Sequence, residues 1–377
     1  MKKILTIIGA RPQIIKAAAL NRAIERDFSG EIKEYILHTG QHYDKNLSQV
    51  FFDELKIPKP DFQLSIGSAP HGEQTGLMMI DIEKVAKELR PDAFVLYGDT
   101  NSTLAGALVG VKMHIPVVHI EAGLRSWNKD MPEEINRIVC DHCSTLLFSP
   151  TSTGLENLKK EGFKSFKVKK FTKHQPGIYH CGDVMYDNSL YFSTLADQKV
   201  GLLKGIRDEF VLATIHRPYN TDSVKRINEV MESLLDLSEK LDKDVILPLH
   251  PRTVNFIKTN IPELEERLNE TKGFHLIPPV GFLEMVLLEQ RSSLVVTDSG
   301  GVQKEAYFFK KPCVIVRTET EWVELVELGC AELCFDVKNE LIKKAKGLLE
   351  KENLQFPPLF GDGNASGFII SEIDKHI

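Results

Sequence analysis

The sequence predicts an α/β protein with two doubly wound domains, each a parallel sheet covered by helices on both faces. The chain has 377 residues, more than a single hydrophobic core usually holds. Short β-branched runs alternate with amphipathic segments of helix length, which is the rhythm of βαβ units. Because this rhythm runs through residues 1–178 and then restarts, we expect two domains.

The expected strands fall into two sets. Those of the first domain are Ile4–Ile8, Glu34–His38, Ala93–Tyr97, Val117–Ile120 and Thr145–Phe148. Those of the second are Phe210–Thr214, Asp244–Pro248, His275–Ile277, Leu294–Thr297 and Cys313–Arg317, separated by helices such as Ser223–Leu241. We place the domains at residues 1–178 and 179–365, and we expect a C-terminal helix at 366–377 to pack back on the first domain.

Composition narrows the classes of function. The net charge of −6 gives no electrostatic reason to expect a nucleic-acid or membrane partner. No stretch approaches the roughly 18 consecutive apolar residues of a membrane-spanning helix. The N-terminal apolar run ends in Gly9-Ala10-Arg11-Pro12, so it is interpreted as a strand rather than a signal peptide. Six cysteines without a secretory signal favour a reducing, cytoplasmic location.

Open parallel sheets bind ligands beyond the carboxyl ends of their strands, so polar residues there are candidates for a site. Arg11 and Lys16 follow the first strand and could neutralise a diphosphate or a developing negative charge. As solvated cations at a helix start they would need no function. No Gly-x-Gly-x-x-Gly follows that strand, which argues against a dinucleotide cofactor.

Three acidic residues also follow or lie near apolar strands. Asp99 precedes Thr-Asn-Ser, so it could be either a reacting group or a helix cap. Glu121 directly follows a buried strand, where partial desolvation would raise its pKa toward values useful in acid–base chemistry. Glu133 and Arg137 are four residues apart on a predicted helix, so they share one face and could form a simple surface ion pair.

The second domain contains a strand that leads into Ser299-Gly300-Gly301 at a helix start. Glycines there let backbone N–H groups approach phosphate oxygens, and the helix dipole favours an anion. Glu305, further along the helix, could accept hydrogen bonds from ribose hydroxyls. His216 lies beside Arg217 at another strand end, where it could bind phosphate or transfer a proton.

The sequence gives no support for a metal centre. Cys140-Asp141-His142-Cys143 resembles half of a zinc site, but no second pair accompanies it and it lies in a predicted helix. We therefore expect neither a metal nor another cofactor.

Six segments, in one order along the whole chain, resemble the non-hydrolysing UDP-N-acetylglucosamine 2-epimerases. They are Gly9–Lys16 (GARPQIIK), His38–His42 (HTGQH), Gly98–Thr100 (GDT), His119–Arg125 (HIEAGLR), Pro132–Arg137 (PEEINR) and Ser299–Gly301 (SGG). The resemblance implies a GT-B fold of two Rossmann-like domains, with the active site in the interdomain cleft, in a homodimer.

The resemblance also implies a reaction. The enzyme removes the C2 proton of a UDP-amino sugar and expels UDP from C1 by anti elimination, and re-addition to the 2-acetamidoglucal inverts C2. The implied catalytic residues are Asp99, Glu121, Glu133, His216, Lys16 and Arg137. The implied UDP-binding residues are Arg11, His250, Phe282, Ser299, Gly300, Gly301 and Glu305.

Departures from the family pattern indicate a substrate. Many members carry arginine where this chain has Trp322, so Trp322 is expected to contact the substrate sugar. This variant and Gly-Ala-Arg-Pro-Gln resemble the branch acting on UDP-2,3-diacetamido-2,3-dideoxyglucuronate, which supplies surface polysaccharides. His71–Gly76 replaces a segment that carries arginine in substrate-regulated members, which argues against allosteric activation by UDP-GlcNAc. The alternatives are a hydrolysing epimerase that releases N-acetylmannosamine and UDP, a GT-B glycosyltransferase and a non-catalytic nucleotide-sugar sensor.

Overall fold

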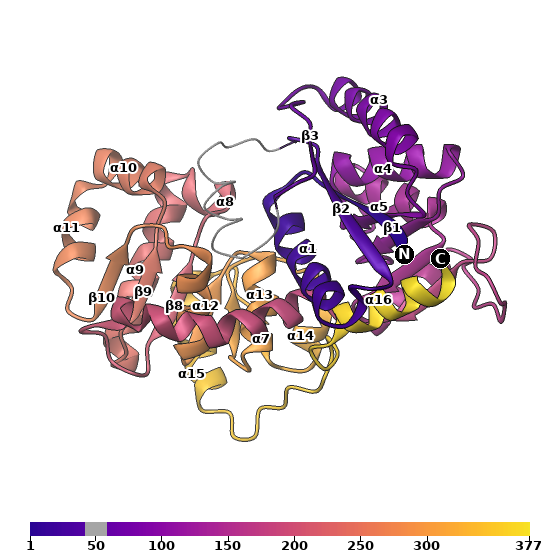
Figure 1. The fold of residues 1–377 in the computed structure, drawn as a ribbon. Helices are drawn as coiled ribbons and strands as arrows, with labels where there is room; N and C mark the ends of the chain where they lie inside the picture. The colour runs from indigo at the N-terminus through magenta and orange to yellow at the C-terminus, as the bar shows by residue number, and fades with distance from the viewer. Residues whose placement is uncertain (42–58) are drawn as a thin grey trace. The chain divides into compact units, whose positions relative to one another are not determined.

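The computed structural model describes residues 1–41 and 59–377, and these form two compact units (Figure 1). Unit 1 comprises Met1–Asn188 and Pro358–Ile377, and unit 2 comprises Ser189–Pro357. Residues 179–188 and 358–365, which we expected in the second domain, therefore belong to unit 1. His42, the last residue of the second resembling segment, lies outside the described residues.

Unit 1 is built on a parallel sheet of seven strands in the order β3-β2-β1-β4-β5-β6-β7. The strands are β1 (Lys2–Ile8), β2 (Ile32–His38), β3 (Phe62–Gln63), β4 (Ala93–Tyr97), β5 (Val117–Ile120), β6 (Leu146–Ser149) and β7 (Gly177–His180). Every residue of β4 and β5 is buried, because parallel strands in the centre of a sheet are covered on both faces. The edge strands β3 and β7 were not predicted.

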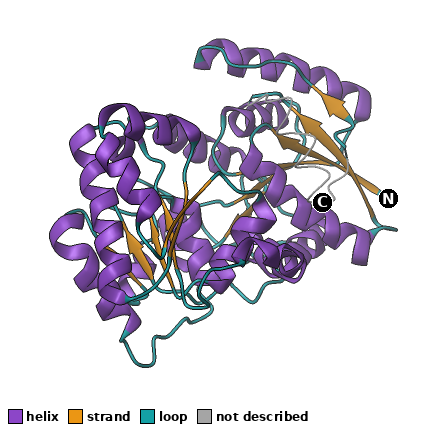
Figure 2. Cartoon of the chain, turned by 90° about the vertical axis from the view of Figure 1, so that its left-hand side faces the viewer, coloured by secondary structure: helices purple, strands orange, loops and turns teal. Residues whose placement is uncertain are grey.

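Helices flank this sheet (Figure 2). They are α1 (Arg11–Ala23) with the π-helical turn η1 (Ile24–Phe28), α3 (His71–Leu89), α4 (Asn101–Lys112), α5 (Pro132–Cys143), α6 (Ser152–Lys160), α7 (Val184–Ala196), which continues into unit 2, and α16 (Ala365–His376). The C-terminal helix α16 packs against α1. Lys2 Nζ and Asp374 Oδ1, 2.9 Å apart, join the two ends of the chain.

Unit 2 repeats the architecture with six parallel strands in the order β10-β9-β8-β11-β12-β13. The strands are β8 (Val211–Thr214), β9 (Val245–Pro248), β10 (Phe274–Ile277), β11 (Leu294–Thr297), β12 (Cys313–Ile315) and β13 (Ala331–Leu333). The helices are η2 (Asp197–Leu203, 3-10), α8 (Pro218–Thr221), α9 (Val224–Leu241), α10 (Pro251–Asn260), α11 (Pro262–Glu270), α12 (Phe282–Arg291), α13 (Gly300–Phe308), α14 (Val323–Glu327) and α15 (Val337–Leu349). Two parallel α/β sheets confirm the predicted fold class.

The strand orders determine which loops meet. In unit 1, β1 pairs with both β2 and β4, so the strand order reverses beside β1. In unit 2, β8 pairs in the same way with both β9 and β11. Ligands of doubly wound sheets bind at the carboxyl ends of strands beside such a reversal. A site is therefore expected at the loops after β1, β4 and β5 in unit 1 and after β8 and β11 in unit 2.

Candidate active site

Lys16 and Glu121 form a partly buried ion pair in unit 1. Lys16 lies on α1 and Glu121 directly follows β5, and the Lys16 ammonium donates to Oε2 of Glu121. Both side chains are largely shielded, with 12% and 9% of their surface exposed. The Lys16 ammonium thus gives this shielded carboxylate an opposite charge in direct contact.

Backbone conformation brings Glu121 into place. Its φ of 72° lies in the left-handed region, which is unfavourable for a residue with a side chain and persists where surrounding contacts enforce it. The N–H groups of Glu121 and Ala122 both donate to the carbonyl of Phe148 at 3.0 Å. Gly98, with φ 60°, lies against the same side chain, because a Cβ added there would meet Glu121 Oε2 at 3.2 Å. Only glycine leaves the carboxylate its full space.

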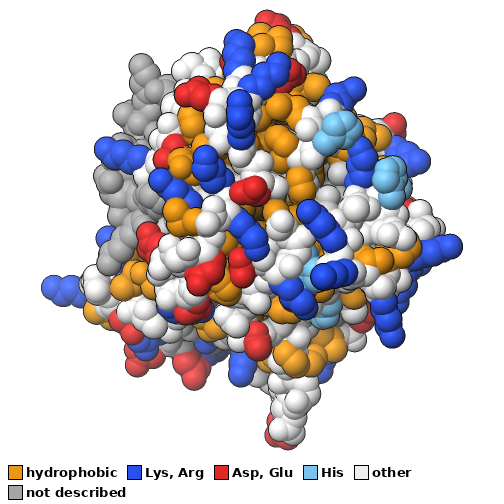
Figure 3. All heavy atoms as spheres, turned by 45° about the vertical axis from the view of Figure 1, so that its right-hand side comes forward, with side chains coloured by type: hydrophobic (Ala, Val, Ile, Leu, Met, Phe, Trp, Pro, Cys, Tyr) orange, Lys and Arg blue, Asp and Glu red, His pale blue; other side chains and the backbone are white. Residues whose placement is uncertain are grey.

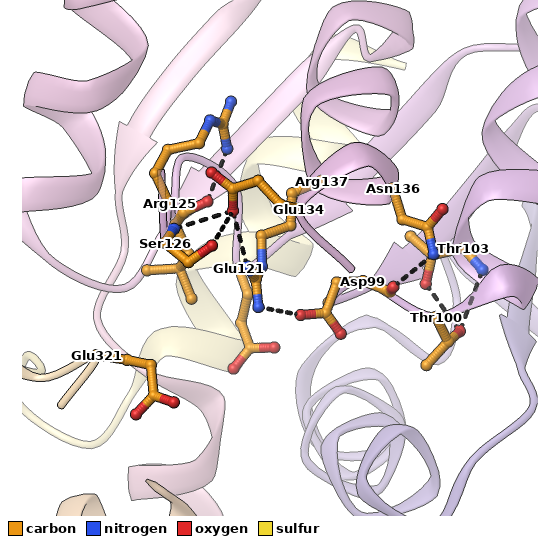
Figure 4. A network of polar contacts seen from close by, with 12 residues as sticks. Asp99, Thr100, Thr103, Glu121, Arg125, Ser126, Glu134, Asn136, Arg137 and Glu321 are labelled. Carbon is orange, nitrogen blue, oxygen red and sulfur yellow. Dashed lines mark hydrogen bonds and ion pairs between the residues drawn. The ribbon is translucent and has the colours of Figure 1, made fainter. Parts of the chain in front are cut away.

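Asp99 belongs to a second cluster, in which Arg137 bridges two carboxylates (Figure 4). The guanidinium of Arg137 on α5 donates to Asp99 through Nη2 and to Glu134 Oε2 through Nη1, the latter at 2.9 Å. Asn136 Nδ2 donates to the Asp99 carbonyl at 2.9 Å. Both the side chain and the backbone of Asp99 are therefore held from α5.

Glu134 organises this cluster and is 1% exposed. Besides Arg137, it accepts hydrogen bonds from Ser126 N and Oγ, at 2.9 and 3.1 Å, and from Trp127 N at 2.9 Å. Burial by itself would raise the pKa of Glu134, but these donors hold it below its ordinary value. The buried carboxylate thus ties the loop after β5 to the guanidinium that holds Asp99.

The surface ion pair that the helical spacing allows between Glu133 and Arg137 does not form. Glu133 is exposed and forms no ion pair with residues 1–41 or 59–377, whereas Arg137 turns to Glu134 and Asp99. Positions i and i+3 also share a helix face. Arg137 pairs with Glu134 rather than Glu133 because the Glu134 carboxylate is buried among further hydrogen-bond donors.

In unit 2, a fully buried carboxylate joins the loops after β8 and β11. Asp298 follows β11 and accepts hydrogen bonds from the N–H groups of His216 and Arg217 and from Asn220 Nδ2, at 2.9 to 3.2 Å. Its Oδ1 lies 2.9 Å from His216 Nδ1. Burial opposes ionisation, but the contacts with His216 and Asn220 hold the pKa of Asp298 below its ordinary value. The His216 side chain is 58% exposed.

Ser299, Gly300 and Gly301, for which a phosphate cradle is predicted, form the start of α13. Ser299 is the N-cap residue, and its Oγ accepts from Val302 N at 3.5 Å. Added Cβ atoms would meet nothing closer than 3.5 Å at Gly300 and 3.8 Å at Gly301, so the backbone there is open to a ligand. The indole N–H of Trp322 donates to the Gly300 carbonyl at 3.0 Å, which places Trp322 beside the cradle.

The remaining predicted UDP-binding residues occupy varied environments. Arg11 is exposed at the first position of α1 in unit 1. His250 is exposed, and its Nδ1 accepts from Arg252 N to cap α10. Phe282 is 8% exposed and packs edge-on against Phe192, with ring centroids 5.1 Å apart. Glu305 is half-buried on α13.

Over residues 1–41 and 59–377, no three His, Cys, Asp or Glu side chains gather as a metal site would require. Cys140 and Cys143 are free thiols, and Asp141 is completely buried. The same part of the chain contains no helix long and apolar enough to cross a membrane. On the face drawn in Figure 3, Lys and Arg side chains are scattered among acidic and apolar ones.

No role was predicted for Glu134 or Asp298, although the sequence carries a signal for Asp298. Asp298 directly follows a buried strand, as Glu121 does. Glu134 falls on the buried side of α5, together with Asn136 and Cys140. Both are buried carboxylates that orient other polar groups, and burial depends on tertiary contacts.

One unit gathers ion-paired carboxylates at its strand ends, and the other presents an open glycine-containing helix start. Each unit is therefore a doubly wound α/β unit with polar groups at the strand ends where such sheets bind ligands. Residues 23–374 match the family UDP-N-acetylglucosamine 2-epimerase, and the chain belongs to that family of carbohydrate isomerases. The family predicted from the sequence is thus confirmed.

Relatives match the chain over nearly its full length. The UDP-2,3-diacetamido-2,3-dideoxy-D-glucuronate 2-epimerase of Pseudomonas aeruginosa is 47% identical over 99% of both chains. The UDP-N-acetylglucosamine 2-epimerase of Methanocaldococcus jannaschii is 40% identical over 98% of both. A crystal structure of the Methanocaldococcus jannaschii UDP-GlcNAc 2-epimerase, in complex with UDP-GlcNAc and UDP, matches with a TM-score of 0.80, 40% identity and 99% coverage of both chains.

Proposed function

We propose that this enzyme inverts C2 of a UDP-2-acetamido sugar without hydrolysing it. A carboxylate removes the C2 proton, the C1–O bond breaks with loss of UDP, and a 2-acetamidoglucal remains bound. A proton then adds to the opposite face of C2, and UDP adds back to C1. The observation that carries the proposal is the pair of ion-paired carboxylates, Glu121 and Asp99, in a member of this family.

In this mechanism each unit has its own task. Glu121, Asp99 and Glu133 supply the proton-transfer groups, while Lys16 and Arg137 balance charge as the carboxylates change state. In unit 2 the N–H groups at the start of α13 bind the diphosphate. His216, whose Nδ1 is held by Asp298, contributes to the binding of the phosphates. Tight binding of UDP prevents the two halves of the intermediate from separating.

The preferred substrate is proposed to be UDP-2,3-diacetamido-2,3-dideoxyglucuronate, with UDP-GlcNAc second. The 47% identity to the Pseudomonas aeruginosa protein supports this order, as does an indole rather than a guanidinium at position 322. Its product would be a precursor of surface polysaccharide.

We further propose a cytoplasmic homodimer, as the family resemblance implies. Light scattering after gel filtration would test the dimer.

The function is tested by incubating the chelator-treated enzyme with each sugar in D₂O and following C2 by NMR. We expect deuterium at C2 of both epimers without net release of UDP. Stoichiometric UDP with free N-acetylmannosamine would instead identify a hydrolysing epimerase. Sugar transfer to an acceptor with C2 unlabelled would identify a glycosyltransferase. Activity restored only by a divalent ion would contradict a metal-free reaction.

A further inference from the structure

His119, in β5, is completely buried, and both of its ring nitrogens face hydrogen-bond acceptors. Nδ1 lies 2.7 Å from Oδ1 of Asp141, on α5. Nε2 lies 2.8 Å from the carbonyl oxygen of Gly98, which follows β4. The ring therefore spans from a helix carboxylate to the turn that carries Asp99.

These two contacts decide the protonation of the ring. A carbonyl oxygen can only accept a hydrogen bond, and so can an ionised carboxylate. Asp141 is ionised, because its Oδ2 pairs with Arg125 Nη2 at 2.7 Å and accepts from Gly123 N at 3.1 Å. A neutral imidazole has a single N–H. The lone pair of its other nitrogen would then lie less than 3 Å from an acceptor oxygen, which is repulsive.

We propose that His119 is an imidazolium that bridges Asp141 to the Gly98 carbonyl and thereby positions Asp99. The role of Asp99 as a reacting group rests on the proposed function, whereas the charge on His119 does not. Gly98 N also donates to the Ile120 carbonyl at 3.0 Å, so the peptide units on both sides of this glycine are fixed. A rigid turn at Gly98 sets the position from which the Asp99 side chain meets Arg137.

The surroundings keep this charge through the neutral pH range. Burial alone would lower the pKa of His119, but the Cys140 sulfur and the Asp141 carboxylate, both on α5, raise it well above its ordinary value. Arg125 is held on Asp141 and also pairs with Glu161, at the end of α6, at 2.6 Å. Each charge in this buried group has an opposite partner, which makes burial tolerable.

Neutron diffraction from deuterium-exchanged crystals of the wild-type enzyme near neutral pH tests the charge directly. We expect deuterium on both Nδ1 and Nε2 of His119 and none on Asp141. Deuterium on only one ring nitrogen, or on the Asp141 carboxyl, would overturn the proposal. This measurement does not depend on which reaction the enzyme catalyses.

The positioning role is tested with His119→Gln, whose amide can donate to Asp141 or to Gly98 but not span both. We expect kcat to fall by roughly tenfold to 100-fold, because misplacement of a reacting group slows chemistry, with KM and UDP affinity unchanged within about twofold. The exposed His174→Gln is the matched control and should behave as wild type. A folded His119→Gln enzyme with wild-type kcat would overturn the positioning role. If the variant does not fold, the neutron map still decides the protonation.

Discussion

The Nδ1 atom of His216 lies 2.9 Å from Oδ1 of Asp298, a carboxylate with no exposed surface. The same carboxylate accepts the backbone N–H groups of His216 and Arg217. It therefore fixes both the side chain of His216 and the turn that carries it. Because Asp298 contacts Nδ1, it leaves only Nε2 of His216 for a ligand.

Asp298→Asn should disturb this arrangement, because its amide nitrogen would face an N–H donor. We expect stability to fall by about 1 to 3 kcal/mol, as for an unsatisfied buried polar group, and kcat/KM to fall by at least about tenfold. Thermal unfolding and steady-state assays measure the two effects. Asp336→Asn is the control, since Asp336 caps α15 on the surface and asparagine caps equally well. Wild-type kinetics in the Asp298 variant would contradict this role for the carboxylate.

Glu134→Gln should lower kcat by acting through Arg137. The amide cannot pair with the guanidinium as a carboxylate does, so Arg137 is less firmly held on Asp99. Arg137→Lys should also lower kcat, because an ammonium lacks the planar fork that bridges two carboxylates. If both substitutions act through one contact, the kcat of the double variant should be no lower than that of the more impaired single variant.

A double-mutant cycle on kcat measures this coupling. The matched control is Glu83→Gln on α3, where an exposed carboxylate pairs with Lys87. Strictly additive losses from Glu134→Gln and Arg137→Lys would show that the two residues act independently.

The central strands and the helix start at Ser299–Gly301 could be predicted from the sequence. Strand β4 is a continuous apolar run and β5 is apolar except for His119, and Ser299–Gly301 has a composition typical of a helix start. The edge strands β3, β7 and β13 are short and only partly buried, so they lack the apolar run that marks a central strand.

The site was less predictable, because its contacts join residues far apart in the sequence. Nothing local distinguishes Glu133 from Glu134; the choice depends on Asp99 and on the loop containing Ser126, which fold against α5. Trp322 donates to Gly300, 22 residues away, and no periodicity encodes such a contact. Local patterns thus indicated where polar groups cluster but not which atoms meet.

Gly301→Val should weaken UDP binding by at least about tenfold while leaving the fold intact. An added Cβ at Gly301 meets only Ser299 Oγ at 3.8 Å and Glu305 Oε2 at 4.0 Å, so the chain itself accommodates it. A branched side chain would, however, occupy the space through which phosphate approaches the N–H groups. Calorimetric titration with UDP measures the effect. Gly347→Val, with nothing within 4 Å, is the control. Unchanged UDP affinity would refute phosphate binding at the start of α13.

Stability should fall as pH rises through the range in which Glu34 titrates. Burial, with smaller contributions from Asp61 and Glu25, raises the pKa of Glu34 from 4.5 to about 7 in the folded chain. Between these values the folded state binds a proton at Glu34 that the unfolded chain releases, so the contribution of Glu34 to stability falls with increasing pH and then levels off. Glu34→Gln should reduce the pH dependence by this contribution, while the exposed Glu31→Gln should leave it as in wild type. Denaturant titrations from about pH 5 to pH 8 provide the comparison. Curves of the same slope for wild type and Glu34→Gln across that range would contradict the shift.

Trp322 should influence substrate choice through its contact with the cradle. It is 8% exposed, donates to the Gly300 carbonyl, and has the Lys304 ammonium 4.5 Å from its ring centroid. We expect wild type to prefer the diacetamido-uronate over UDP-GlcNAc, and Trp322→Arg to narrow that ratio, because a guanidinium replaces an apolar surface with a fork of donors.

Trp322→Phe separates the two contributions of the indole. It keeps an aromatic ring near Lys304 but removes the N–H, so UDP affinity should fall while the ratio between the sugars is retained. Val323→Arg, which adds the same cation at an exposed neighbouring position, is the control for charge alone. The measurement is kcat/KM for both sugars in all four proteins. If Trp322→Arg lost both activities in proportion, the indole would support the cradle without selecting the sugar, since selection requires unequal effects on the two transition states.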